Sequence, residues 1–314
     1  MTIAGGPPQP LIRVDPALAE PAVWGVLTRT AGSGEARMAA HGRRADPIYD
    51  ARDPASRDTA FARLALAEFT ELALADPLLQ AIAERPLLAD RVRVVLIADA
   101  RGHRDEGVTC EAGSEHLGFR IDASRFADAD RLLEWARHAL GHAEDTLDAT
   151  FGFQRGWDAG GAGSTVPAAT QARLHRLWDV SVDARLEAAG RSAGRSVRER
   201  HRARIAADLS GAGDAAIDAV VERLWVGPRP TFPALLDWAA RPATLVAETA
   251  PAGAGRLRPD RCPLCRFPSD DVDVPDPAIG DLAAAEYPSW RPDHGLCARC
   301  ADRYRFAARL GGAT

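Results

Sequence analysis

Lysine is absent from this sequence of 314 residues, and all 39 basic residues are arginine. The absence excludes Schiff-base chemistry on a lysine and a phosphate-binding P-loop lysine. The sequence also lacks any run of about 18 apolar residues, the length that crosses a bilayer as a helix. Met1 is followed by glycine and proline instead of a basic and then apolar leader. We therefore expect a cytoplasmic protein without a membrane partner.

Charge of one sign is not in large excess, since the net charge is −5. Nucleic-acid binding usually requires a basic surface, so we expect the partner to be another protein or a small molecule, with a protein favoured. The composition leaves the oligomeric state open. Hydrophobic residues make up 46% and charged residues 26% of the chain. These fractions are typical of globular proteins, so a core can form without disulfides.

The pattern of apolar residues predicts an α+β fold that is mainly helical and has a small β-sheet. The proline-rich residues 1–57 are predicted to form an irregular N-terminal arm with at most a short helix. Residues 58–250 are predicted to form a helical domain, and a Gly/Pro-rich linker at Ala250–Arg261 precedes a small domain at 256–314. The strands are expected at Arg91–Ala100, Gly107–Glu111 and Leu117–Ile121, and long helices at Asp128–Asp148 and Gln171–Ala189.

Cysteine is scarce, but four of the five cysteines form two CxxC pairs, Cys262/Cys265 and Cys297/Cys300, separated by 31 residues. Two CxxC turns offer the four thiolates that tetrahedral zinc prefers. The separation exceeds the usual range of roughly 15 to 20 residues, although the intervening Asp/Pro-rich segment can loop out. The alternative is four cysteines in an apolar core without metal. His294, shortly before the second pair, is an alternative ligand.

The cysteine pattern resembles zinc ribbons and rubredoxin-like knuckles over about 40 residues. The resemblance implies one structural zinc ion in a closed site, which stabilises the fold and has no open position for chemistry. Acidic and basic residues balance between Arg256 and Thr314, so this small domain lacks the positive charge of a nucleic-acid finger.

A second group of ligand types lies on the two long predicted helices. His138 and His142 are four residues apart, which places both imidazoles on one helix face, where they can bind one metal ion. Asp179 and Asp183 are also four residues apart and share a face of the next long helix. The alternative is that all four are ordinary solvated residues of amphipathic helices.

These residues resemble the gluzincin group of zincin metallopeptidases. In that group a strand runs beside a helix that carries HExxH, and a later helix supplies an acidic third ligand. The resemblance implies that Leu117–Ile121 is the strand, that His138, His142 and Asp179 bind a second zinc ion, and that Asp183 holds a histidine in its tautomer.

The sequence departs from HExxH at Ala139, where the family has the glutamate that takes a proton from zinc-bound water. Alanine cannot accept a proton. Glu134, one turn before His138, and Asp145, almost one turn after His142, are hypothetical displaced bases. A base acts within about 3.2 Å of the water that it activates, and a residue one turn away rarely reaches it.

Three functions follow from these observations. The first is a zinc-binding, catalytically impaired zincin-like protein that acts as an accessory, assembly or protein-binding factor. The second is a zinc-dependent hydrolase or peptidase with a displaced base. The third is a nucleic-acid-associated ribbon protein, which the charge argues against. The basic run Arg191–Arg204 fits either a phosphate or acidic-partner site or a solvated helix face.

Overall fold

The computed structural model describes residues 9–29, 34–111, 113–154, 166–191, 195–209, 212–249, 261–267, 269 and 272–311. The chain divides into two compact units, and each is described by itself. The first comprises the described residues of 1–163, 181–194 and 230–233. The second comprises those of 164–180, 195–229 and 234–314.

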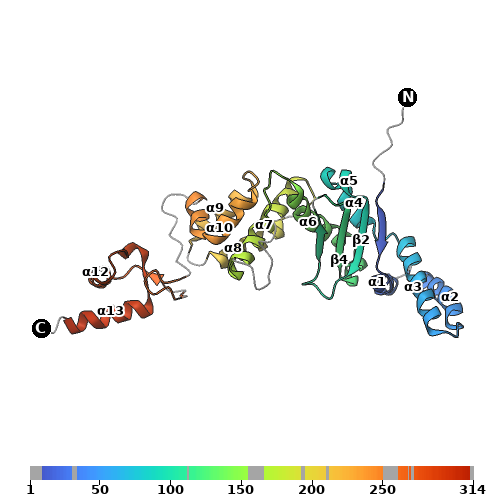
Figure 1. Cartoon of the computed structure of the whole chain (residues 1–314), viewed down its shortest axis with the longest axis horizontal. Helices are drawn as coiled ribbons and strands as arrows, with labels where there is room; N and C mark the ends of the chain where they lie inside the picture. Colours follow the sequence, from blue (N-terminus) through green and yellow to red (C-terminus); the bar gives the residue numbers. More distant parts are fainter. Residues whose placement is uncertain are drawn as a thin grey trace, which may run out of the picture. The chain divides into compact units, whose positions relative to one another are not determined.

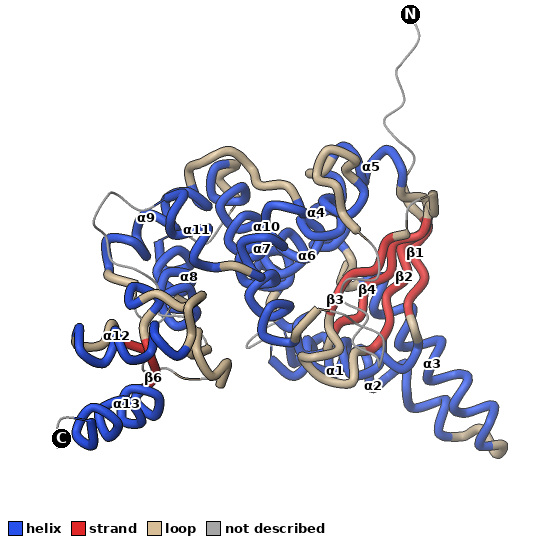
Figure 2. The backbone as a smooth tube through the Cα atoms, turned by 60° about the vertical axis from the view of Figure 1, so that its left-hand side comes forward, coloured by secondary structure: helices blue, strands red, loops and turns tan. Residues whose placement is uncertain are grey.

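The first unit contains a four-stranded mixed sheet in the order β1-β2-β4-β3 (Figure 2). Strand β2 pairs in parallel with both β1 and β4, and β3 pairs antiparallel with β4. One face of β2 and β4 is buried through alternate residues, as expected for a sheet that covers a core. The strands are β1 (Leu11–Val14), β2 (Val94–Asp99), β3 (Gly107–Cys110) and β4 (His116–Ile121).

Helices outnumber strands in the first unit, as Figure 1 shows. Helix α1 packs against α3 and β2, and α6 packs against α4 and β3. The expectation of a mainly helical α+β fold is thus confirmed. The helices are α1 (Pro16–Arg29), α2 (Gly34–Tyr49), α3 (Pro54–Glu71), α4 (Asp76–Ala83), α5 (Pro86–Arg91), the 3-10 helix η1 (Ala123–Ala127) and α6 (Ala129–Leu147).

The N-terminal segment differs from the irregular arm predicted for residues 1–57. Its described residues form β1, α1, α2 and the start of α3. The Asp53-Pro54 pair starts a helix instead of interrupting one, because the Asp53 carboxylate accepts a hydrogen bond from the Ser56 backbone N–H at 2.8 Å. Proline is favoured in the first turn of a helix, where its missing N–H costs no hydrogen bond.

The second unit begins with helices. Helix α9 packs against α8 and α11, and α7 is one unbroken helix whose C-terminal turns belong to the first unit. The basic run Arg191–Arg204 reaches into α8, where Arg202 pairs with Asp218 and Asp214 of α9 at 2.6 and 2.9 Å. The helices are α7 (Ala168–Ala188), α8 (Arg195–Asp208), α9 (Asp214–Trp225), α10 (Phe232–Ala240) and α11 (Pro242–Thr249).

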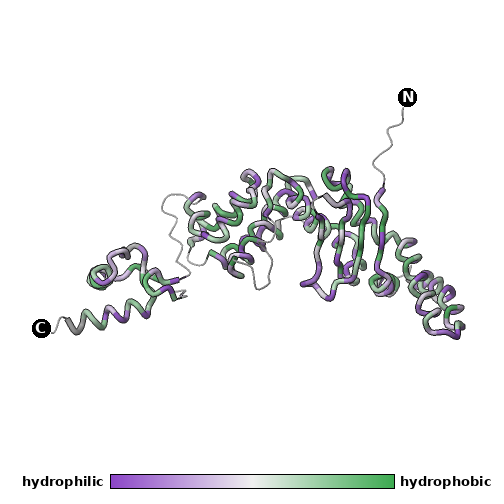
Figure 3. Tube along the Cα trace, viewed as in Figure 1, coloured by the Kyte–Doolittle hydropathy of each residue, from purple (hydrophilic) through white to green (hydrophobic). Residues whose placement is uncertain are grey.

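The C-terminal part of the second unit has its own small apolar core, formed by Val272, Ile279, Trp290, Leu296 and Tyr304 with the buried cysteines. Strands β5 and β6 pair antiparallel, and hydrophilic and hydrophobic residues alternate along α13 (Figure 3). The elements are β5 (Val272–Asp273), α12 (Pro277–Glu286), the 3-10 helix η2 (Pro292–His294), β6 (Leu296–Cys297) and α13 (Ala298–Gly311).

None of the helices in the described ranges combines the length and the apolar character needed to cross a membrane. The linker predicted at Ala250–Arg261 falls, apart from its last residue, outside the described residues. The division into a domain at 58–250 and a domain at 256–314 therefore stays a prediction.

Candidate metal centres

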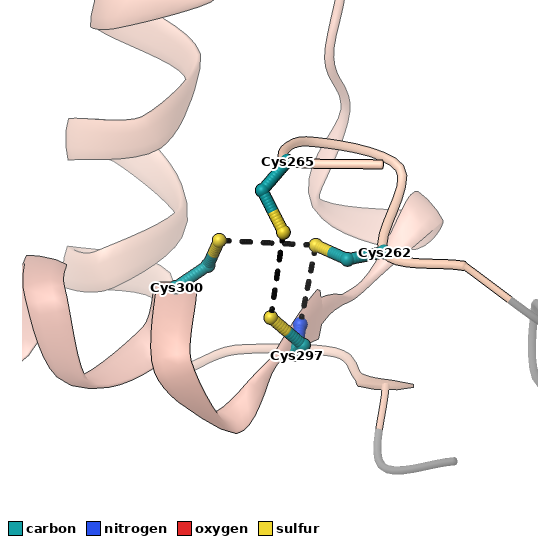
Figure 4. Close-up of side chains that lie close together, drawn as sticks. All are labelled: Cys262, Cys265, Cys297 and Cys300. Carbon is teal, nitrogen blue, oxygen red and sulfur yellow. Dashed lines mark hydrogen bonds between the residues drawn. The ribbon is translucent and has the colours of Figure 1, made fainter. Parts of the chain in front are cut away.

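The four cysteines of the two CxxC pairs converge in the C-terminal part of the chain. Cys262 and Cys265 lie on a turn, Cys297 ends β6, and Cys300 lies in the first turn of α13. The sulfur atoms point toward one another (Figure 4). The Cys262 and Cys300 sulfurs are 3.9 Å apart, the Cys265 and Cys297 sulfurs are 3.8 Å apart, and all four lie within 4.8 Å of one another.

These distances fit a tetrahedral zinc ion. Four sulfurs at about 2.3 Å from zinc lie roughly 3.8 Å from one another, close to the two printed separations. Three of the cysteines are buried and Cys265 is exposed. His294 is not part of the cluster, and its Nδ1 atom accepts a hydrogen bond from the Arg291 backbone N–H at 3.4 Å. The ligand set is therefore four thiolates, and zinc is the ion that it fits.

Backbone N–H groups and burial shift the pKa values of the cysteine thiols in opposite directions. Burial would raise the pKa of the Cys262 thiol, but the backbone N–H groups of Cys265, Cys297 and Leu264 outweigh it and lower the pKa to about 7. Burial raises the pKa of the Cys297 and Cys300 thiols. The fold thus stabilises one thiolate. A bound divalent ion would offset the cost of burying the negative charge of the others.

The second group begins on α6, which positions the two histidines. The Asp128 side chain caps this helix by accepting a hydrogen bond from the Arg131 backbone N–H at 3.0 Å. The buried stripe of Leu132, Ala136, Leu140 and Ala143 fixes the rotation of the helix. His138 and His142 then lie one turn apart, each partly exposed.

The two imidazoles approach each other in a way that suits a shared metal ion. Their Nε2 atoms are 3.2 Å apart, and the ring centroids are 4.9 Å apart. Two nitrogens at about 2.0–2.1 Å from a tetrahedral zinc ion lie about 3.3 Å apart. The pair therefore has the separation that a common zinc ion requires.

Helix α7 supplies the carboxylates. Asp183 Oδ1 lies 2.6 Å from His138 Nδ1, which fixes the ring so that its Nε2 atom faces His142. Asp179 lies one turn earlier on the same helix. A carboxylate oxygen of Asp179 and one nitrogen of each of His138 and His142 all lie within 4.8 Å of one another. The structure thus brings together all four residues that the sequence singled out here.

The hypothetical displaced bases are placed differently from each other. The Glu134 side chain is exposed on α6. Asp145 is fully buried, and its two carboxylate oxygens accept hydrogen bonds from both terminal nitrogens of Arg185 at 2.8 and 2.6 Å. Ala139, at the position of the family glutamate, has no side-chain acceptor. The Asp145 carboxylate is thus committed to holding α6 against α7.

The supporting contacts around the histidines were missed by sequence reasoning. Gly141 allows α6 to approach α7 closely, because a Cβ atom there would lie 2.5 Å from Cγ1 of Val182. Arg85 donates to Glu144 at 2.5 Å, and Arg137 donates to Glu84 at 2.8 and 2.5 Å, which ties α6 to the α4–α5 segment. The glycine between the histidines was the one available signal, since glycine in a helix interior is costly without a packing reason.

Comparison with known proteins adds no relative. No protein-family model, no curated protein and no solved structure matches the chain. The case for a function therefore depends on the two ligand groups and their surroundings.

Proposed function

We propose that this protein is a zincin-like, zinc-binding accessory or assembly factor that holds two zinc ions, contacts another protein and does not cleave peptides. One observation carries the proposal. The ligand atoms of His138, His142 and Asp179 converge within 4.8 Å, yet the residue between the histidines that would act as a base is Ala139.

The chemistry of the histidine group explains the expected lack of cleavage. Zinc, when bound there, would lower the pKa of a water ligand and polarise a carbonyl group. The residues of this chain would hold the ion through two imidazoles and a carboxylate, with Asp183 orienting His138. General-base catalysis contributes roughly 100- to 10,000-fold, and the carboxylate of Asp145 is engaged by Arg185. A site of this kind supports binding better than turnover.

The C-terminal cysteine cluster supports a role in contacting another protein. A closed four-cysteine site stabilises a fold without doing chemistry. In the C-terminal part of the chain, Phe267, Val274 and Phe306 expose 62%, 67% and 64% of their surface. Large apolar and aromatic side chains are enriched in the contact surfaces of proteins, so these exposed residues are consistent with the proposed role.

Zinc counting tests the proposal directly. We expect two zinc ions per chain by elemental analysis of the purified protein, and one in the double variant His138→Ala/His142→Ala. The matched control is His294→Ala, which alters an exposed histidine outside both groups and should retain two ions. One zinc ion in the unaltered chain would contradict the second site, and none would contradict both.

Ala139→Glu tests the missing base. We expect the unaltered protein to show no chelator-sensitive cleavage of an unstructured peptide, and the variant to gain it because a carboxylate then reaches the zinc-bound water. Ala139→Gln has nearly the same size but no base, and should gain nothing. Cleavage by the unaltered protein would contradict the proposal and favour a hydrolase that uses Glu134 or Asp145.

A further inference from the structure

A small pocket lies between α1, α2 and α3, apart from both metal centres. It has a volume of about 160 Å³, and its walls include Trp24 from α1, His41 and Tyr49 from α2, and Phe61 and Glu68 from α3. We call these five residues the aromatic pocket. It combines two exposed aromatic residues with a buried carboxylate.

The aromatic rings of the pocket are held at angles to one another and stay accessible. Trp24 meets His41 edge to face at 6.2 Å between centroids, and Tyr49 meets Phe61 in the same way at 5.1 Å. Trp24 exposes 52% and Tyr49 exposes 64% of its surface. Aromatic faces carry partial negative charge and attract cations that lose their water shell.

The charged groups of the pocket give it a negative balance. The Glu68 side chain is only 8% exposed, and its Oε2 atom lies 2.8 Å from His41 Nδ1. Arg44 lies 3.6 Å from the other Glu68 oxygen, but it donates two shorter hydrogen bonds to Glu71, at 2.6 and 2.9 Å. Glu20 also lines the pocket. The pocket walls thus carry two carboxylates, Glu20 and Glu68, and no arginine lines them among the residues that the structure describes, which favours a cationic ligand over an anion.

We propose that the aromatic pocket binds a small alkylammonium compound, with a quaternary ammonium head group such as that of choline as the best-fitting class. Such a cation cannot donate a hydrogen bond and is weakly hydrated, so aromatic faces and a nearby carboxylate recognise it better than water does. A metal ion is a poorer occupant, because the indole and phenyl walls offer no ligand atoms and the His41 Nδ1 atom already contacts the Glu68 carboxylate at 2.8 Å. This inference is independent of both zinc sites.

The test is calorimetric titration of the full-length protein with choline chloride and with its uncharged isostere, 3,3-dimethylbutan-1-ol. We expect saturable binding of choline and binding of the isostere about tenfold weaker, the size of a cation–π contribution. Equal binding of the two compounds would show an apolar pocket and overturn the proposal. Absence of saturable choline binding at millimolar concentrations would overturn it as well.

Single substitutions test whether choline binds in the aromatic pocket. Trp24→Leu should weaken choline binding about tenfold, whereas Phe306→Leu, which alters a similarly exposed aromatic residue in the C-terminal part, should leave it unchanged. Glu68→Gln keeps the side-chain size and should weaken binding of choline but not of the isostere. Circular dichroism checks folding, and Tyr49→Leu replaces Trp24→Leu if that variant unfolds. Unchanged affinity in a folded Trp24 or Tyr49 variant would overturn the assignment.

Discussion

The two metal centres are built on different supports. The cysteine ligands lie on a turn, a two-residue strand and the first turn of a helix, and their apolar core is small. The histidine group instead lies on helices of 19 and 21 residues, with Asp145, Arg185, Arg85 and Glu144 in ion pairs beside it. The comparison leads us to expect that an ion bound by the cysteines would be part of the fold of its region, whereas the helices around the histidines are held together by ion pairs of the chain itself.

Loss of a cysteine ligand should give the largest effect. Structural zinc contributes roughly 10 to 16 kcal/mol of folding free energy in zinc-finger peptides, far more than an apolar core of this size can replace. We expect Cys265→Ser to unfold residues 272–311 while the first unit keeps its structure, as measured by NMR amide dispersion or limited proteolysis.

Cys110 offers a matched control for the ligand substitution. It is a half-buried cysteine in β3, and burial raises the pKa of its thiol, as expected for an unreactive side chain. Cys110→Ser should leave the C-terminal part folded. A folded C-terminal part in Cys265→Ser, or in metal-free protein, would show that zinc is not needed there and would remove the contrast between the centres.

Breaking the Asp145–Arg185 pair should destabilise the first unit by an intermediate amount. Asp145 is fully buried, and removal of one partner from a buried pair costs about 3 to 5 kcal/mol because the other charge stays without compensation. Arg185 keeps 32% of its side chain exposed, so we expect the low end of this range for Asp145→Asn. The change in unfolding free energy can be measured by urea denaturation monitored by circular dichroism.

An exposed ion pair provides the comparison for that variant. Asp302 and Arg305 pair at 2.6 Å on α13 with side chains that are 70% and 51% exposed. Asp302→Asn should change stability by less than about 1 kcal/mol. If Asp145→Asn lowers the unfolding free energy by no more than Asp302→Asn does, the buried pair does not hold α6 against α7.

A methyl group at Gly141 should lower stability less than loss of the buried Asp145–Arg185 pair does, and it should selectively weaken zinc binding at the histidines. Overpacking costs about 1 to 3 kcal/mol, and alanine regains about 1 kcal/mol of helix propensity. We therefore expect Gly141→Ala to lower the unfolding free energy by roughly 1 kcal/mol. Because α6 then shifts from Val182, zinc at the histidines should bind more weakly while the cysteine-bound zinc is retained.

Gly42→Ala is the control that changes helix propensity without introducing a steric contact. A Cβ atom at Gly42 in α2 meets nothing within 4 Å, so alanine should stabilise the protein by about 0.5 to 1 kcal/mol. Elemental analysis after dialysis against a weak chelator compares zinc retention in the two variants. Equal retention would show that the close approach of α6 and α7 does not control the histidine group.

The sequence predicted the long helices and three of the four strands because their apolar residues recur with regular spacing. It did not predict α2, in which Gly34, Gly42 and Pro47 weaken the helical pattern. Pro47 cannot donate a hydrogen bond to the carbonyl four residues earlier, and α2 ends two residues after it, at Tyr49. Strand β1 has four residues between Pro10 and Asp15, too few to show a period.

For the candidate sites, spacing in the sequence was informative where ligands share one local element. The CxxC turns and the histidine pair are of this kind, and the i, i+4 spacing of Asp179 and Asp183 placed both on one face. The ion pairs that hold α6 were not predictable, because Arg185 and Asp145 are 40 residues apart and their pairing depends on how two helices cross. Two charged residues that are so far apart in the sequence show no spacing from which their pairing could be predicted.

The parallel pairing of β1 with β2 has a consequence for synthesis on the ribosome. Leu11 pairs with Val94, so β1 emerges 83 residues before its partner. At about 5 to 20 residues per second, the strand waits roughly 4 to 17 seconds with both edges unpaired. Ile12 and Val14, which pack against the core of the folded protein, lack their partner strand throughout this interval. The nascent chain is therefore most vulnerable to association before residue 94 is made, and its N-terminal segment is the region that a nascent-chain chaperone would protect.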